Sequence, residues 1–328
     1  MPASPGALRF NSDSNKLELY DGNQWTEIVA SSPDSQTGGA RGVFGGGYSP
    51  ASTNTIDYIN ISSTGNAITF GQLNDAIRNS TSACSSRTRG LWGGGNNEPS
   101  TNSNQIDFVT ISSTGNATDF GDLTVARRGT AAVSNGTRGV WAGGRTPVHQ
   151  NVMDYITIAS QGDAQDFGDL TRSSSPINSL PAQSSTRGLF AGGYSPVINS
   201  IDFITISTQG NSADFGDLTV ARSTGGGCSN AIRALFGGGY SGNVIDYVTI
   251  ATLGNAIDFG DLLYSSSQIS ACSSSTRGVW AGGYISPATT NSINYVSIMS
   301  TGNAVDFGDL TVARFIRNAG CSNGHGGL

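Results

Sequence analysis

Short runs of β-branched and aromatic residues alternate with turns rich in Gly, Asn and Ser along most of the chain. The run IDFITI at residues 201–206 is largely apolar on both faces, as in a strand that is buried on both sides. Such runs, separated by turn residues, indicate consecutive antiparallel strands. No segment between them has the period of an amphipathic helix. We therefore predict an all-β protein built of small sheets.

The pattern recurs as six repeats whose starting residues lie 44 to 49 positions apart. Each repeat opens with Arg-Gly-apolar-aromatic-small-Gly-Gly, with Ala234 in place of the first Gly in one of them. The segments begin at Arg41, Arg89, Arg138, Arg187, Arg233 and Arg277. An apolar-Asp-aromatic run follows, with INY at 293–295 in the sixth repeat. A Gly-Asn or Gly-Asp turn and an Asp-Phe-Gly-Asp-Leu run come next, and the first repeat has TFGQL at 69–73 in place of the latter. Three or four strands in such a repeat fit one blade of a six-bladed β-propeller.

The two ends of the chain predict how the ring closes. Interior repeats carry a strand before the Arg-Gly segment, such as GTAAVSNG at 129–136, but the first repeat has PDSQTGG at 33–39. The missing strand occurs as NAGCSNG at 318–324. We expect this segment to supply the innermost strand of the first blade and so to remove an open sheet edge. The predicted division is an arm and linker at 1–37 and the propeller at 38–328.

Two resemblances follow from these repeats. The Gly-Gly after the second strand and the Arg between repeats resemble kelch repeats, although Phe replaces the kelch Trp near the fourth strand. These residues are Phe70, Phe120, Phe167, Phe215, Phe259 and Phe307. The longer pattern, DFGDLTVAR with CSNG and RGVWAGG, is similar to repeat proteins of marine cyanophages described as virion structural or tail-fibre-like. The resemblance covers about residues 40–328 and implies a virion protein made in the host cytoplasm.

Residues 8–25 are expected to form strand, turn, strand, turn and strand, a small β-hairpin arm. They resemble a short β-module of phage fibre and appendage proteins. A segment of this size is too small for a core of its own. We expect it to attach to other virion proteins, or to its own copies in a homo-oligomer, through Phe10, Leu17, Leu19, Tyr20 and Trp25. The alternative is an ordered arm that lies on the propeller.

Composition excludes several partners. The net charge is −6 and Lys16 is the single lysine, whereas nucleic-acid binding needs a basic face. No apolar stretch approaches the roughly 20 residues of a membrane helix, so we expect no membrane insertion. The first residues lack the features of a signal peptide, which favours synthesis in a cytoplasm.

The Asp-Phe-Gly motif is also a kinase metal-binding motif, but the kinase partners of that motif are missing here. Aspartate and arginine recur together, as Asp122 with Arg127 and Asp217 with Arg222. We expect such pairs to fix the geometry between blades. The alternative is a ring of carboxylates that binds Ca²⁺.

No catalytic or metal site is predicted. Cys84, Cys228, Cys272 and Cys321 share one register with Val133 and Ala182, which indicates small buried packing positions and free thiols. There is no Cys-x-x-Cys, and only His149 and His325 add to the cysteines as metal ligands. The motifs of known propeller enzymes and of a Gly-x-Ser-x-Gly nucleophile are absent. We expect a protein without enzymatic activity and without cofactors.

Comparison of the repeats separates uniform from variable loops. The loops between second and third strands, and from the fourth strand to the next blade, vary and are expected on one face. That face carries Tyr48, Asn96, Asn97, Arg145, His149, Tyr194, Tyr240, Tyr264 and Tyr284. Aromatic and amide side chains suit a host-surface polysaccharide or a protein surface. The alternatives are loops that merely tolerate change, a purely architectural capsid or tail protein, and a cellular kelch-like scaffold.

Overall fold

The chain divides into two compact units, Met1–Gly39 and Ala40–Leu328. The computed structural model describes residues 4–11, 16–27, 40–48, 51, 53–74, 79–97, 101–171, 179–240, 242–317 and 319–328. Within these ranges the chain is all-β, and its strands form mostly four-stranded antiparallel sheets. The described part of the chain contains no helix that is long and apolar enough to span a membrane.

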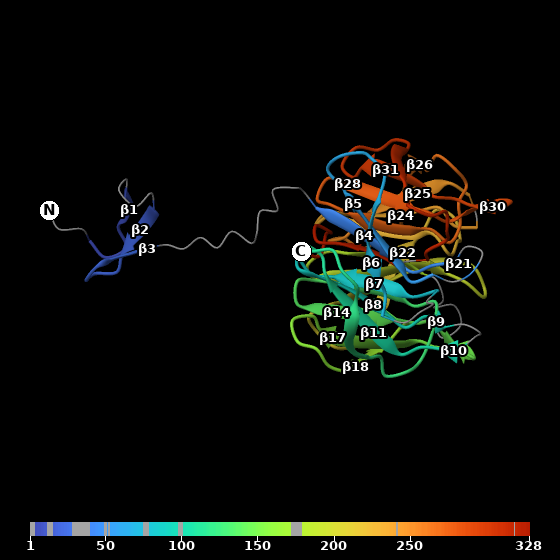
Figure 1. Ribbon diagram of the computed structural model, residues 1–328, viewed down its shortest axis with the longest axis horizontal. Coiled ribbons are helices and arrows are strands. Elements are labelled where there is room, and N and C mark those ends of the chain that lie inside the picture. Colours follow the sequence, from blue (N-terminus) through green and yellow to red (C-terminus); the bar gives the residue numbers. More distant parts are fainter. Residues whose placement is uncertain are drawn as a thin grey trace. The chain divides into compact units, whose positions relative to one another are not determined.

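The N-terminal unit contains one antiparallel sheet in the order β1 (Leu8–Asn11), β2 (Lys16–Tyr20) and β3 (Trp25–Glu27) (Figure 1). Asp21 Oδ1 accepts hydrogen bonds of 2.8 Å from two backbone N–H groups of the second turn, and these bonds lower the pKa of Asp21. The rings of Tyr20 and Trp25 lie 5.3 Å apart, and the Arg9 guanidinium lies 4.2 Å from the Trp25 ring centre. The strand and turn pattern agrees with the prediction.

The larger unit contains six four-stranded antiparallel sheets among its described residues. The first has the strand order β33 (Gly320–Ser322), β4 (Arg41–Gly45), β5 (Thr55–Asn60), β6 (Ile68–Gln72). The second has β7 (Ser82–Ser85), β8 (Arg89–Gly93), β11 (Gln105–Thr110), β12 (Thr118–Asp122). The third has β13 (Ala131–Ser134), β14 (Arg138–Ala142), β17 (Val152–Thr157), β18 (Gln165–Asp169).

The other three sheets have the same antiparallel order. The fourth has β19 (Leu180–Gln183), β20 (Arg187–Gly193), β21 (Ile198–Thr205), β22 (Ala213–Asp217). The fifth has β23 (Gly226–Ser229), β24 (Arg233–Gly237), β25 (Val244–Thr249), β26 (Ile257–Asp261). The sixth has β27 (Ser270–Ser273), β28 (Arg277–Ala281), β31 (Ser292–Ser297), β32 (Val305–Asp309).

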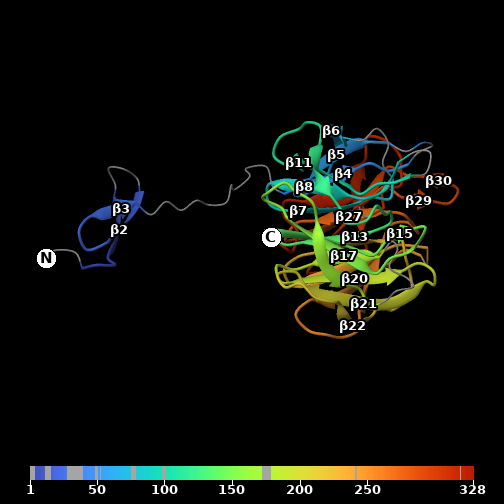
Figure 2. The same cartoon turned by 90° about the horizontal axis from the view of Figure 1, so that it is seen from below.

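Three short hairpins extend from loops between second and third strands. They are β9 (Asn96–Asn97) with β10 (Thr101–Asn102), β15 (Arg145–Thr146) with β16 (Val148–His149), and β29 (Tyr284–Ile285) with β30 (Ala288–Thr289). In Figures 1 and 2 these hairpins lie on one side of the unit and the C-terminal end of the described chain lies on the other.

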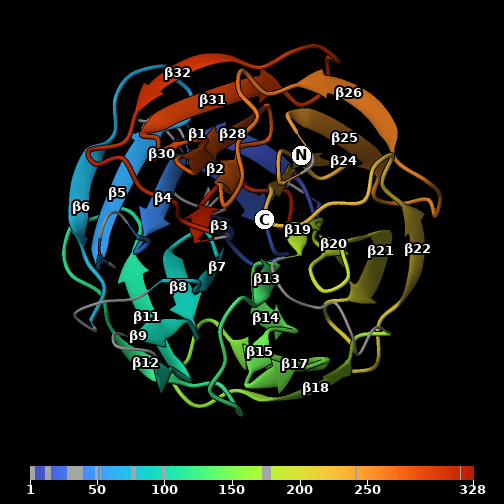
Figure 3. The same ribbon diagram turned by 90° about the vertical axis from the view of Figure 1, so that its right-hand side faces the viewer.

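The six sheets lie around a common centre, with the first strand of each sheet nearest the middle (Figure 3). These inner strands contact one another in the order β7, β13, β19, β23, β27 and β33, and β33 also contacts β7. The first and second strands of each sheet are therefore largely buried on both faces, which explains why they lack a strict apolar and polar alternation, whereas the fourth strands are partly exposed.

The last strand completes the first sheet, as the sequence predicted. Strand β33 pairs antiparallel with β4, and Cys321 lies opposite Val43. The Arg41 N–H donates a 2.8 Å hydrogen bond to Asn323 Oδ1 and so extends the pairing beyond the strand.

The Asp-Phe-Gly segments form contacts between neighbouring sheets. The β11–β12 register shifts between Ile106 and Asp107, and Gly121 has a φ of 144° at this bulge. A Cβ on Gly121 would overlap the Gly162 carbonyl of the next sheet, and the Gly162 N–H donates a 2.9 Å bond to the Phe120 carbonyl. The equivalent bond between the sixth and first sheets, from Gly65 to Phe307, measures 2.8 Å.

Neighbouring sheets are matched in side-chain size at two positions. At the first, the aromatic residue of the Arg-Gly segment packs against the small residue that follows the aromatic in the preceding repeat. Where a Cβ on that residue would lie 2.6 to 2.8 Å from an indole, the residue is glycine: Gly45 with Trp92, Gly93 with Trp141 and Gly237 with Trp280. Where the aromatic is Phe, an alanine shares its cluster: Ala142 with Phe190, Ala191 with Phe236 and Ala281 with Phe44.

The second match involves the cysteine register. A Cβ on the glycine of the Arg-Gly segment would lie 2.5 to 3.1 Å from a side chain in the inner strand of the preceding sheet. The pairs are Gly42 with Cys272, Gly90 with Cys321, Gly139 with Cys84, Gly188 with Val133 and Gly278 with Cys228. In the one repeat where Ala234 replaces this glycine, the inner strand of the preceding sheet carries Ala182, which belongs to the same apolar cluster. Close packing tolerates only such matched volumes.

This match predicts a compensating pair of substitutions. Gly139→Ala should lower the free energy of unfolding by about 1–3 kcal/mol, because the new methyl group overlaps Cys84 Sγ. Adding Cys84→Ala should restore part of that loss, since it recreates the Ala182 and Ala234 pairing. The measurement is denaturant unfolding of all four members of the cycle.

Gly136→Ala is the matched control, because a Cβ there meets nothing within 4 Å. The proposed fit would be contradicted if the losses in free energy of unfolding caused by Gly139→Ala and by Cys84→Ala simply added in the double variant.

Candidate functional site

The residue after each Gly-Gly occupies an equivalent loop position in all six repeats. These residues are Tyr48, Asn96, Arg145, Tyr194, Tyr240 and Tyr284. The loop that leads to an inner strand forms backbone bridges with this position: Phe315 with Tyr48, Asn79 with Asn96, Arg128 with Arg145, and Ser267 with Tyr284. In these four repeats the backbone is thus held in a common way while the side chains differ.

A pocket of about 310 Å³ lies among these loops. The described residues that line it are Asn79, Ser80, Arg128, Gly129, Arg145, Tyr194, Thr224, Tyr240 and Arg317. Three of these described residues are arginines, two are tyrosines and none is acidic. The pocket therefore offers N–H donors, hydroxyl groups and aromatic faces in a chain whose net charge is −6.

The loops that enter the inner strands have an unusual backbone conformation at one register. The φ angle is 57° at Ser80, 62° at Thr224, 57° at Gln268, 40° at Arg317 and 68° at Gly129. Positive φ is uncommon for residues with a Cβ and is often retained at functional sites. Four of these five residues line the pocket; Gln268 contacts a lining residue instead.

Arg317 is held by neutral acceptors from two other loops. Its Nη1 donates a 2.7 Å hydrogen bond to Ser80 Oγ, and its Nε and Nη2 donate bonds of 2.9 and 2.6 Å to Gln268 Oε1. Burial lowers the pKa of Arg317; Tyr240 opposes this effect and the positive charge of Arg128 adds to it. The guanidinium is therefore oriented but not neutralised by these contacts.

The other side chains of the pocket are more exposed. Tyr194 is 47% and Tyr240 is 58% exposed, and their ring centres lie 6.4 Å apart. Arg145 is exposed, whereas Arg128 is half-buried and donates a 3.2 Å bond from Nη1 to Asn96 Oδ1. The two rings form a solvent-exposed edge of the pocket, so a ligand can contact them from solvent.

The structure brings together three of the predicted site residues, Arg145, Tyr194 and Tyr240. Tyr48 and Tyr284 are half-buried, and Tyr48 stacks on Phe315 with ring centres 5.1 Å apart.

The remaining predicted residues lie outside the described pocket lining. Asn96 is buried and supports Arg128, and Asn97 lies in β9, although its side chain is outside the described part of the structure. His149 pairs with Arg145 across β15 and β16, and Tyr264 is 49% exposed.

Sequence reasoning missed Arg128 and Arg317, together with Asn79, Ser80 and Thr224. Alignment of the repeats on the cysteine register places Arg317 where other repeats have Ser, Gly, Asn, Thr or Gln. That departure from the repeat is the signal in the sequence that marks it.

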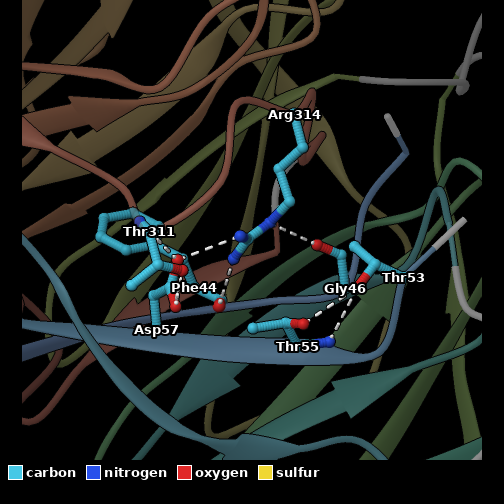
Figure 4. Close-up of polar contacts among 7 residues, drawn as sticks. All are labelled: Phe44, Gly46, Thr53, Thr55, Asp57, Thr311 and Arg314. Atoms are coloured by element: carbon cyan, nitrogen blue, oxygen red, sulfur yellow. Dashed lines mark hydrogen bonds and ion pairs between the residues drawn. The ribbon is translucent and has the colours of Figure 1, made fainter. Parts of the chain in front are cut away.

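The predicted pairing of aspartate and arginine within one repeat is wrong. Arg314 instead bonds Asp57 of the first repeat, with Nη1 3.0 Å from Oδ2, and Thr311 Oγ1 donates a 2.6 Å bond to Oδ1 (Figure 4). Arg127 pairs with Asp154 and Arg222 with Asp246 in the same way. The arginine reaches the next sheet because its loop crosses between sheets before it enters an inner strand.

These ion pairs connect sheets and are closed to ligands. Both partners of the Arg314–Asp57 pair are fully buried, and burial lowers the pKa of Arg314 while Asp57 raises it. In the sixth sheet Asn294 stands at the aspartate position, and Ser266 stands at the arginine position of the loop before that sheet. Loss of one charge is thus accompanied by loss of its partner, as an unpaired buried charge would be costly.

The described residues include no group of three His, Cys, Asp or Glu side chains arranged to hold a metal ion. No protein-family model matches the chain, and no curated protein matches it.

The inner strands enclose a cavity of about 30 Å³, room for water but not for a sugar. All four cysteines line it as buried free thiols, in agreement with the prediction, and burial raises the pKa of Cys321 to about 12. His325 also lines this cavity. Its Nε2 lies 3.0 Å from the Ser85 carbonyl, and its Nδ1 accepts bonds from Gln183 Nε2 at 3.1 Å and from the Gly327 N–H at 3.0 Å.

His325 predicts a loss of stability in mild acid. Its contacts require a neutral ring with the proton on Nε2, and burial lowers its pKa to about 4 from an ordinary value of 6.5. The unfolded chain therefore binds more protons between pH 6.5 and 4, so stability falls as the pH decreases through this window, by up to about 3 kcal/mol. His325→Gln should remove this component from the pH dependence of the free energy of unfolding.

The difference between the two proteins is the quantity to measure, because the carboxylates titrate in both. Parallel stability curves from pH 7 to pH 4 would show that His325 does not cause the effect.

Proposed function

We propose that the six sheets are the blades of a closed, kelch-like β-propeller. The support is that every boundary between successive sheets, including the one from sixth to first, has one hydrogen bond in common. At each of them the Arg of the Arg-Gly segment donates to an isoleucine carbonyl of the next sheet, as from Arg277 to Ile61 at 3.0 Å. The size-matched pairs also continue across that boundary, with Phe44 beside Ala281 and Gly42 beside Cys272.

We propose that the chain is a non-enzymatic phage virion protein, of a fibre or appendage, whose loop face recognises a host-surface glycan. The observation that carries this proposal is the pocket, which joins Arg145, Tyr194 and Tyr240 from three different repeats. Tyrosine rings give stacking area and a hydroxyl group, and guanidinium groups give several oriented donors. This combination suits the hydroxyl-rich faces of sugars.

A purely architectural role is the second candidate, and the N-terminal sheet favours it. Leu8 and Phe10 are 61% and 64% exposed there, whereas Leu19, Tyr20 and Trp25 are half-buried. The Leu17 side chain lies outside the described residues. Exposed apolar side chains on so small a sheet suit attachment to another virion protein or to a second copy. Both roles are compatible in one appendage.

Deletion of residues 319–328 tests the closure. Loss of β33 leaves an unpaired edge on the first sheet and removes its contacts with β7 and β27, so the melting temperature should fall clearly and the transition should broaden. Cys321→Ala, which keeps the backbone pairing and removes only one buried side-chain group, is the control and should lower the melting temperature much less than the deletion does. An unchanged melting temperature after the deletion would speak against a closed ring.

Alanine substitution of Tyr194 and Tyr240 together tests recognition. Binding of the full chain to intact candidate host cells and to their extracted polysaccharide should weaken about tenfold or more, because tyrosines of this kind contribute strongly to binding surfaces. Tyr264→Ala is the matched control, being similarly exposed but not among the residues that line the pocket. No binding by the parent chain, together with stable association with virion proteins through residues 1–37, would favour the architectural role.

A further inference from the structure

The pocket concentrates positive charge in an acidic protein. Three of the 17 basic residues of the chain line one pocket of about 310 Å³, and its described lining contains no carboxylate. We propose that the pocket selects an anionic sugar and binds its carboxylate or sulfate group through Arg317, Arg128 and Arg145. This inference rests on the proposed glycan recognition and names the chemical class of its ligand.

Arg317 is prepared for an oxyanion. Three of the five N–H groups of a guanidinium are used in its bonds to Ser80 and Gln268, and two remain for a ligand. Because those bonds already fix the side chain, binding costs little further rotamer entropy. A planar fork that is held in place suits the paired oxygens of a carboxylate or sulfate.

The repeat itself does not account for Arg317. At the equivalent position four of the five other repeats carry Ser80, Gly129, Thr224 and Gln268, all with positive φ, so the fold needs no long cationic side chain there. The loop from Arg314 to Cys321 also has one residue more than the loop from Arg222 to Cys228. Arg317 retains a φ of 40° although it has a Cβ. The positive φ is common to the repeat, whereas the cationic side chain is the departure from it.

Repulsion between like charges in the pocket favours the binding of an anion. Arg128 lies near enough to Arg317 to lower its pKa, so the two cations repel each other when the pocket holds no anion. An oxyanion between them replaces this repulsion with charge-assisted hydrogen bonds. Tyr194 and Tyr240 at the edge then provide surfaces for the sugar ring.

The test uses the full chain and two pairs of polymers, each pair having one sugar backbone in a charged and an uncharged form. Polygalacturonate is compared with its fully methyl-esterified form, and dextran sulfate is compared with dextran, by calorimetry or biolayer interferometry. We expect at least one charged polymer to bind about tenfold more tightly than its neutral partner, and binding to weaken as salt is added. The charged polymer that binds identifies the group as carboxylate or sulfate.

Variants connect the binding to the pocket. Arg317→Gln and Arg145→Gln should each weaken binding of the charged polymer about tenfold, the loss expected for a charge-assisted hydrogen bond. Arg87→Gln removes the same charge from an exposed turn outside the pocket and should change binding little. Should Arg317→Gln unfold, the exposed Arg145→Gln decides.

Three outcomes would overturn the inference. Equal binding of charged and neutral polymers would leave glycan recognition standing while removing the requirement for an anion. Binding that Arg317→Gln and Arg145→Gln do not affect would place the anion elsewhere. Failure of both charged polymers to bind, while host polysaccharide binds in a manner that depends on Tyr194 and Tyr240, would reject the anionic group and retain the glycan.

Discussion

The fit between neighbouring sheets is the constraint on which the rest of the larger unit depends. A sheet of four strands, most of them four to six residues long, cannot bury enough apolar surface alone, and here each face is covered by the next sheet. The aromatic of one repeat occupies the space that Gly or Ala leaves in the preceding one, with indole against glycine and phenyl against alanine. Changing one partner therefore requires a change in the other.

Much of the fold was predictable because the repeat is strict. The run of short strands in each repeat, the shared cysteine register and the pairing of the last strand with β4 all follow from comparing repeats. The ion pairs were assigned wrongly because Asp122 is closer to Arg127 in sequence than Asp154 is, while the loop geometry turns the arginine toward the next sheet. Sequence distance is a poor guide where a loop crosses between sheets.

The candidate site was predictable only in part. Its exposed residues, Arg145, Tyr194 and Tyr240, stand in variable loops and could be found by their variation. Arg128 and Arg317 come from loops that enter the inner strands, and only their positions in space bring them to the same pocket. The size-matched pairs, in contrast, are readable in the sequence once each repeat is compared with the one that follows it.

The pairing of β33 with β4 has a consequence for how the chain is made. The hydrogen bond from Arg41 to Asn323 joins residues 282 positions apart, whereas most other strand pairs are local hairpins. During synthesis, the hairpins form as they leave the ribosome, but the first sheet keeps an open edge until residues 320–322 have been translated. That edge is free to pair with other nascent chains in the interval between the synthesis of β4 and that of β33, so aggregation during production of this protein is most favoured in that interval.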